Sequence, residues 1–438
     1  MSTVLPPVPE TLFLTPVVPA PEGNGLAMRA GMLLEGLARD SHVTLVTIPL
    51  AGAPPESWSE FVRRRTRARH CIALERATPP QTPAKPLDQT VGRDRQTLRR
   101  FLQPSLTRLL TAQVLEDVRR TLDATRFDLV VVFRLYLAPT AECVRLESSR
   151  PPRLWLDADD DEASTRREMA EVHTMRGEAD AASDLQAEAD RYAVLEAQWL
   201  PRFDVVTMCS DADRAIVSAR SGHPNVRVLP NCAPMVHEPT ERAAESRPAA
   251  ADARTGAEKS PTHPLTLLFV GSLGYFPNAD AATVLCRDVV TALRQLTSRA
   301  VRVDLVGARP NPEVRALASV DGVRIHENVD ALAPFYERAD VAVVALRAGG
   351  GTRIKILEAL LRGCPVVSTA IGARGLDAEH GRHLLIADDP VSMAAACLQV
   401  AENPALAATL RENGRALATM QYGLARSIEV IRVLAAAP

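Results

Sequence analysis

The stretch DVAVVALRAGGGTRIKILEALL, residues 340–361, contains three patterns in the order in which they occur in a βα unit. It begins with a continuous apolar run, residues 340–346, typical of a parallel strand covered on both faces. A glycine-rich turn follows. After the turn, apolar residues recur at helical spacing and share one face: Ile354, Leu357, Leu360 and Leu361. The stretch therefore predicts a strand, a turn and an amphipathic helix, the repeating unit of an α/β fold.

Two cations, Arg353 and Lys355, lie in the first turn of this predicted helix. The N-terminal end of a helix carries the positive end of its dipole, so cations there are unfavourable unless an anion neutralises them. The preceding glycines, Gly349, Gly350 and Gly351, allow backbone N–H groups to approach a phosphate closely. We interpret the turn as a nucleotide-diphosphate site.

Two further residues complete this predicted site, Thr352 in the turn and Glu358 about one helical turn on. Glu358 can accept two hydrogen bonds, as ribose or sugar hydroxyls would supply. The alternative is an ordinary surface helix in which Lys355 and Glu358, three positions apart, form a salt bridge. The glycines and the strand–turn–helix context favour the phosphate interpretation.

Apolar, β-branched runs alternate with helical segments along the chain, in two series. Strands are predicted at residues 11–18, 42–50, 127–135, 153–157 and 203–210, and then at 265–271, 301–307, 323–329, 340–346, 365–370 and 383–387. Strands of this kind separated by helices indicate doubly wound α/β layers, with a long helical region at 162–200. Two series predict an α/β protein of two facing Rossmann-like domains with a cleft between them, because such sheets bind ligands beyond the carboxyl ends of their strands.

Residues 240–264, between the two series, contain no large apolar residue and are rich in Ala, Pro, Glu and Arg. A segment of this composition cannot bury a core, so we predict a flexible linker. The predicted domains are then residues 1–239 and 265–421, and a final helix follows at 422–438.

The composition excludes several classes of protein. The chain has 51 Lys and Arg against 53 Asp and Glu, a net charge of −2. A charge this close to zero gives no electrostatic reason to expect binding of nucleic acid. No apolar run is long enough to span a membrane, and we identify no signal peptide. The seven cysteines are widely spaced and form no CxxC pair, which indicates reduced thiols and no zinc site. We therefore expect a cytoplasmic protein.

Four segments resemble retaining glycosyltransferases of family 4. GGGTRIKILEALLRGCPVVSTAIGARGL, residues 349–376, resembles the donor-binding signature of that family. Segments 19–39, 226–234 and 267–282 resemble its first loop and helix, the end of its N-terminal domain and the start of its C-terminal domain. The resemblance implies the two-domain GT-B fold, a nucleotide-diphosphate sugar as co-substrate, no metal or other cofactor, and transfer with retention of configuration. It also implies that residues 422–438 return to the N-terminal domain, which would hold the acceptor.

The resemblance implies roles for residues on the donor side. Arg353 and Lys355 are the catalytic candidates, because they would stabilise the leaving diphosphate. Gly271 and Ser272 end the first strand of the second series and would approach the donor. The alternative for them is a plain βα turn in which Asn278 caps the following helix. The predicted donor-binding residues are Gly271, Ser272, Gly349, Gly350, Gly351, Thr352 and Glu358.

One position departs from the pattern of the family, whose members often carry two glutamates eight residues apart. Glu358 is the second of these, and Gly350 stands at the first position. The missing glutamate commonly contacts the transferred sugar, so the identity of that sugar stays open.

On the acceptor side, the resemblance places Gly25 and Arg29 at a loop and helix that face the donor from the opposite wall. Arg134 follows the predicted strand at 127–135. It could bind an acidic acceptor or a phosphate, or it could pair with the acidic cluster at residues 157–162. We leave these two alternatives open.

That acidic cluster, DADDDE, also follows a predicted strand. A DxD arrangement of carboxylates can hold a divalent metal ion. In a two-domain architecture, however, arginine and lysine neutralise the diphosphate instead. We therefore predict acceptor-side or structural roles for Asp159 and Asp160, and no metal site.

A cluster of arginines forms a basic patch in the N-terminal half: Arg63, Arg64, Arg65, Arg67 and Arg69, with Arg99 and Arg100 further on. Most such clusters are solvated faces. The alternative is peripheral contact with anionic lipid at the inner face of the membrane, or with a lipid-linked acceptor.

The residues and the resemblance together predict a glycosyltransferase that moves a sugar from a nucleotide-diphosphate donor to an acceptor hydroxyl. The acceptor would be a glycan, a lipid-linked or a small molecule, and the pathway polysaccharide or glycoconjugate biosynthesis. Two alternatives share the architecture. A nucleotide-sugar epimerase would need a histidine in the cleft, and we identify none. A non-catalytic partner subunit would not need the intact glycine-rich segment.

Overall fold

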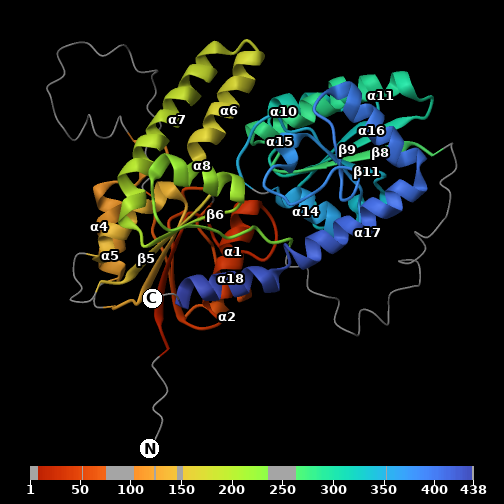
Figure 1. Cartoon of the computed structure of the whole chain (residues 1–438). Coiled ribbons are helices and arrows are strands. Elements are labelled where there is room, and N and C mark those ends of the chain that lie inside the picture. Colours follow the sequence, from red (N-terminus) through yellow and green to blue (C-terminus); the bar gives the residue numbers. More distant parts are fainter. Residues whose placement is uncertain are drawn as a thin grey trace, which may run out of the picture. The chain divides into compact units, whose positions relative to one another are not determined.

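The computed structural model describes residues 8–51, 53–74, 103–122, 125–145, 151–234, 263–351 and 353–436. The chain divides into two compact units (Figure 1), Met1–Pro230 with Ser427–Pro438, and Asn231–Arg426. Most of the predicted linker, residues 240–262, lies outside the described residues, as do Arg99, Arg100 and Thr352. Each unit is built on one parallel sheet.

The first unit contains a seven-stranded sheet in the order β3-β2-β1-β4-β5-β6-β7. Its strands are β1 (Glu10–Thr15), β2 (His42–Thr47), β3 (Ala68–Cys71), β4 (Leu129–Phe133), β5 (Arg153–Asp159), β6 (Val205–Met208) and β7 (Val226–Val228). The five strands predicted for this half are all present. β3 and β7 are short edge strands whose sequences, ARHC and VRV, contain arginine. They lack the continuous apolar run by which the other strands are recognised.

The helices of the first unit are α1 (Gly25–Leu37), α2 (Glu60–Arg65), α4 (Ala112–Leu122), α5 (Glu142–Arg145), α6 (Glu162–Met175), α7 (Ala179–Trp199) and α8 (Asp211–Ser221), with most of α18 (Leu424–Ala436). The predicted helical region at 162–200 is two helices, α6 and α7. They are separated at Gly177, whose φ of 75° is readily adopted only by glycine.

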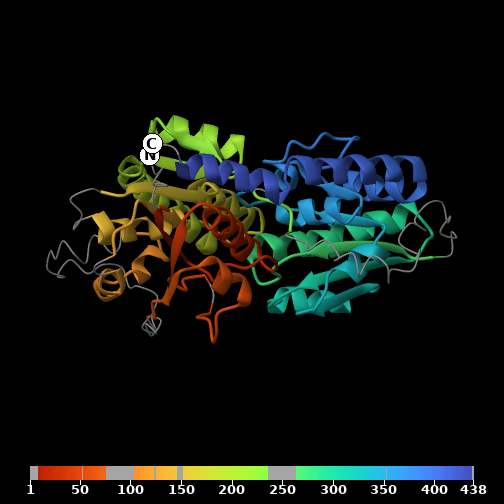
Figure 2. The ribbon, with the colours of Figure 1, turned by 90° about the horizontal axis from the view of Figure 1, so that it is seen from below.

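Helix α18 lies beside α1, although the two are at opposite ends of the sequence (Figures 1 and 2). Ile431 of α18 is fully buried, and a Cβ on Gly36 of α1 would come within 2.7 Å of its side chain. Glycine at position 36 therefore permits the close approach of the two helices. Arg153, at the start of β5, also donates to the carbonyl oxygen of Leu434, at 2.6 Å.

The second unit contains a six-stranded sheet in the order β10-β9-β8-β11-β12-β13. Its strands are β8 (Leu265–Val270), β9 (Val301–Gly307), β10 (Val323–Glu327), β11 (Val341–Val344), β12 (Val366–Ser368) and β13 (Leu385–Ile386). Its helices are α10 (Phe276–Val284), α11 (Val290–Leu296), α12 (Pro312–Ala316), α13 (Ala333–Arg338), α14 (Ile354–Leu361), α15 (Ala370–Ala373), α16 (Pro390–Glu402) and α17 (Pro404–Met420). All six predicted strands are present, and the predicted class of two parallel-sheet Rossmann-like α/β domains is confirmed.

Candidate functional site

The strand order of the second unit reverses between β8 and β11, which pair directly. In open parallel sheets a crevice forms outside the carboxyl ends of the strands at such a reversal, and ligands bind there. Two loops meet at this point, residues 271–275 after β8 and residues 345–353 after β11. The glycine-rich turn and the start of α14 therefore lie where a doubly wound sheet binds its ligand.

The glycine-rich turn has a backbone that glycine adopts most readily, with a φ of 128° at Gly349 and 75° at Gly351. Arg353, the N-cap residue of α14, folds its guanidinium over this turn and donates to the carbonyl oxygens of Gly349, at 2.5 Å, and of Gly350. Arg374 also donates to the Gly349 carbonyl, at 2.8 Å. Two positive charges therefore lie at the turn that the sequence predicts for phosphate.

Lys355, in the first turn of α14, extends to the loop after β8. Its Nζ donates to Oδ1 of Asn278, at 2.5 Å, and lies 4.7 Å from the centre of the Phe269 ring. Burial, and then the nearby charge of Arg353, lower the pKa of Lys355 to about 7. The alternative in which Lys355 forms a salt bridge with Glu358 is wrong, because the ammonium turns towards Asn278 instead.

The alternative role of Asn278 as a helix cap is also wrong. The N-cap residue of α10 is Tyr275, and it has no side-chain cap. Asn278 lies inside the helix, where its Nδ2 donates to the carbonyl oxygen of Ser272, at 3.0 Å, while its Oδ1 accepts from Lys355. An asparagine near the start of a helix is compatible both with capping the helix and with this contact to lysine. The sequence alone therefore does not separate the two roles, and the fold does.

Glu358 is held by two neighbours, Arg362 and Tyr336. Its Oε1 accepts from Nε of Arg362, at 3.1 Å, and its carboxylate is hydrogen-bonded to the hydroxyl of Tyr336. Burial, and then the charge of Glu358, raise the pKa of Tyr336 well above its ordinary value. Tyr336 and Arg362 were not predicted as site residues, because nothing in their local sequence indicates a contact between α13 and α14.

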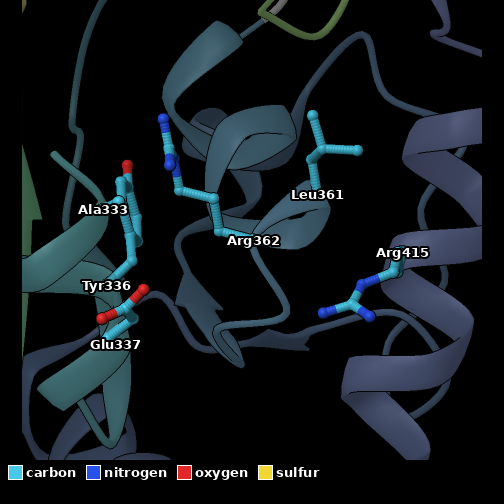
Figure 3. A pocket seen from close by; sticks show the side chains of 6 residues that line it. All are labelled: Ala333, Tyr336, Glu337, Leu361, Arg362 and Arg415. Carbon is cyan, nitrogen blue, oxygen red and sulfur yellow. The ribbon is translucent and has the colours of Figure 1, made fainter. Parts of the chain in front are cut away.

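Tyr336 and Arg362 also line a cavity of about 390 Å³ between α13, α14 and α17 (Figure 3). In Figure 3 the guanidinium of Arg415, from α17, points into this cavity from the side opposite Tyr336.

A second cavity, of about 370 Å³, lies at the carboxyl ends of β8 and β9. Its lining is Ser272, Gly274, Tyr275, Ala308 and Arg309. Ser272 belongs both to this cavity and to the loop that Asn278 holds.

The first unit buries the predicted cation Arg29. The side chain of Arg29 has no exposed surface; its guanidinium contacts Asp157, at 2.7 Å, and Asp159, at 3.2 Å. Asp157 in turn accepts from the hydroxyl of Thr207, at 2.6 Å. The fully buried guanidinium of Arg29 therefore holds these two carboxylates in place. Gly25 is the exposed first residue of the same helix.

Arg134 is paired with the acidic cluster, which is one of the two alternatives that the sequence left open. Its guanidinium contacts Asp159, at 2.7 Å, Asp160, at 2.6 Å, and Glu162. Arg134 and Asp159 both have a positive φ, 80° and 70°, which is uncommon for residues other than glycine. Burial raises the pKa of Asp160 to about 7, although the charge of Arg134 opposes that shift.

The other carboxylates of the cluster also have arginine partners. Asp161 contacts Arg220, at 2.9 Å, and Glu162 contacts Arg166, at 2.9 Å. In the described part of the chain, no group of three or more His, Cys, Asp or Glu side chains is arranged to hold a metal ion. The acidic cluster therefore forms an ion-pair network with arginines.

Several arginines of the predicted basic patch are paired as well. Arg64 contacts Glu60, Arg65 contacts Glu35, and Arg67 contacts Glu10. None of the helices among the described residues combines the length and the apolar character needed to cross a membrane. All seven cysteines are free thiols, as their spacing predicts.

Two parallel-sheet Rossmann-like domains, one with charged groups at its switch point, form the GT-B architecture of glycosyltransferases. Residues 264–403 match a family described as glycosyl transferases group 1. A search of curated proteins gives no significant match. The matched segment spans most of the second unit and includes its entire sheet, so the chain is a glycosyltransferase, an enzyme that transfers a sugar.

Solved structures share this fold over nearly their whole length. The chain is 17% identical to a sucrose-phosphate synthase from Thermosynechococcus elongatus, with a TM-score of 0.66 over 97% of this chain and 98% of the other. Anabaena HepE, solved with UDP and glucose, is 14% identical, with a TM-score of 0.61 over 98% and 100%. WaaG, a glycosyltransferase involved in lipopolysaccharide biosynthesis, is 14% identical, with a TM-score of 0.58 over 98% and 100%. At these sequence identities, the structural similarity to these proteins establishes the fold alone.

Proposed function

We propose that the protein is a retaining glycosyltransferase of family 4 whose second unit binds a nucleotide-diphosphate sugar. The observation that carries this proposal is the position of Lys355, whose ammonium lies at the switch point between β8 and β11 and is bonded there to a neutral amide, Oδ1 of Asn278. Anabaena HepE has been solved with UDP and with UDP-glucose, which supports a nucleotide-sugar donor for the same fold.

The proposed reaction uses the groups at the switch point. The bond from the anomeric carbon to the diphosphate oxygen breaks, and a bond to the acceptor oxygen forms on the same face of the sugar. The hydroxyl proton goes to the departing diphosphate. Lys355, Arg353 and the N-terminus of α14 stabilise the negative charge that develops there. Glu358 accepts hydrogen bonds from the ribose. In this proposal no metal or other cofactor takes part.

The first unit is proposed to present the acceptor, a glycan, a lipid-linked or a small molecule, in polysaccharide or glycoconjugate biosynthesis. The carboxylates of Asp159 and Asp160 lie at the carboxyl end of β5, where Arg29 and Arg134 hold them. We assign Asp159 and Asp160 the contact with the acceptor, because their side chains keep 12% and 14% of their surface exposed while that of Arg29 keeps none. The protein would act in the cytoplasm, with the exposed arginines of α2 in peripheral contact with the membrane.

One incubation tests the reaction. The protein is mixed with UDP-, GDP- and ADP-sugars and a cell extract as the source of acceptor, and nucleotide and sugar products are separated. Sugar on the acceptor together with free nucleoside diphosphate supports the proposal. An epimerised nucleotide-sugar would show an epimerase. Neither conversion nor donor binding would show a partner subunit.

A variant links the reaction to the switch point. Lys355→Met should lower turnover by about 100-fold or more, the order of loss when one group that stabilises a developing anion is removed. Arg382→Met is the matched control, because Arg382 is a cation of the same unit whose side chain is 60% exposed and pairs with Glu379. Full activity of Lys355→Met, or an equal loss in both variants, would contradict the proposal.

A further inference from the structure

We propose that Asn278 is a positioning residue that holds the ammonium of Lys355 at the switch point, where it meets the donor diphosphate. The inference rests on the proposed function and adds to it a residue from the helix that follows β8. Lys355 enters from α14, after β11, and Asn278 belongs to α10, after β8. Their hydrogen bond joins the first turns of these two helices across 77 positions of sequence.

The orientation of the Asn278 amide is fixed by its second contact. Its Nδ2 donates to the carbonyl oxygen of Ser272, at 3.0 Å, and a carbonyl can only accept. Oδ1 must therefore point the other way, and it accepts from Lys355 at 2.5 Å. Asn278 is buried, with 8% of its surface exposed, so its amide has little room to turn. The amide oxygen of Asn278 is therefore oriented to accept a hydrogen bond from a cation on one side.

Lys355 needs such a partner because its side chain is long and its charge is desolvated. The lysine side chain has a flexible four-carbon stem and loses considerable rotamer entropy when it is held in one place. Its Nζ lies over the face of Phe269, which attracts a cation but does not fix its direction. Among the residues that the structure describes, Asn278 is the single hydrogen-bond acceptor for this ammonium.

A neutral amide suits this task better than a carboxylate would. An aspartate at position 278 would pair with Lys355 and cancel its charge, and it would repel a diphosphate. Asparagine directs the ammonium and leaves its charge for the ligand. The backbone approaches closely on the same side, since a Cβ on Gly271 would lie 3.1 Å from Nζ of Lys355. A phosphate bound at this loop is therefore within reach of the ammonium.

A double-mutant cycle tests the inference, with UDP, GDP and inorganic pyrophosphate as probes and affinity measured by calorimetry. Asn278→Ala should weaken binding of the diphosphate probe by about tenfold or more, because it removes a hydrogen bond to a charged group. In the Lys355→Met background the same change should have almost no effect, because Asn278 acts through Lys355. Asn278→Ser gives a second cycle if Asn278→Ala folds poorly.

The matched control is Asn403→Ala. Asn403 also uses its amide oxygen inside the second unit, to accept from the backbone of Leu406 at 3.0 Å, but it caps α17. Its loss should lower stability and leave affinity unchanged. Equal losses for Asn278→Ala in the parent and Lys355→Met backgrounds would overturn the inference. If the parent protein binds none of the probes, the proposed function fails instead, and the two failures are thereby distinguished.

Discussion

Lys355 is a buried cation with a neutral amide as its hydrogen-bond partner and the charge of Arg353 nearby, and this environment predicts a dependence on pH. Burial lowers its pKa to about 7 in the folded protein, against an ordinary value of 10.5 in the unfolded chain. Between these values the unfolded chain binds more protons than the folded one. The contribution of this group to the free energy of unfolding therefore increases as the pH rises through that window.

Lys355→Met should remove this contribution. The variant should be more stable than the parent near neutral pH, because it no longer buries a cation, and the difference should shrink towards about pH 9. Urea unfolding of both proteins across that range measures it. Parallel pH profiles would show that Lys355 is not desolvated in solution as it is in the structure.

Glu358 is a carboxylate whose proposed task is to bind ribose hydroxyls. Glu358→Gln keeps the shape but loses charge-assisted hydrogen bonds, which are roughly twice as strong as neutral ones. We expect weaker donor binding and a smaller preference for the nucleotide over its 2′-deoxy analogue. Measuring both affinities in parent and variant gives the discrimination ratios.

Tyr336→Phe is the control for this prediction. It removes the hydroxyl bonded to Glu358 and leaves the carboxylate in place. The ratio should then change less than in Glu358→Gln. An unchanged ratio in Glu358→Gln would mean that Glu358 only satisfies Arg362 and Tyr336 inside the second unit.

At the level of elements, α18 is a structural part of the first unit. Ile431 is fully buried in this unit, in contact distance of Gly36 of α1. Ile431→Ala should therefore lower the free energy of unfolding of the first unit by about 2–5 kcal/mol, as large-to-small changes in a core do.

Val433→Ala is the matched control, because Val433 is on the same helix and 65% exposed. Its effect should stay within about 0.5 kcal/mol. Denaturant unfolding of both variants measures the difference, and binding of nucleotide by the second unit should be unchanged. Similar small effects of both substitutions would mean that α18 is not docked in solution.

For the whole molecule, the composition of the predicted linker, residues 240–264, carries its own prediction. Residues 240–264 contain no large apolar side chain, so they can bury almost nothing. Removing residues 245–256 should leave the thermal stability of both units nearly unchanged, since loop length affects closure entropy only weakly. We expect turnover to change more than stability. A large drop in melting temperature would show that the segment is packed.

The sequence by itself determined the elements and the kind of chemistry. Continuous apolar runs located eleven of the thirteen strands of the structure, because a buried parallel strand needs apolar side chains on both faces. The glycines and cations at residues 349–355 predict a turn for an anion, because cations at a helix N-terminus are unfavourable without one. Both inferences depend on residues that are close together in the sequence, so a local sequence pattern is enough to make them.

Tertiary structure alone decided which side chains meet. Arg29 and Lys355 are both cations in the early part of a helix, yet Arg29 is buried against two carboxylates and Lys355 reaches an amide. The difference arises because strand order places Asp157 beside the first helix and Asn278 beside the second. Partners that lie 128 and 77 positions away leave no local pattern, so the charge that stays available for a ligand is set by the fold.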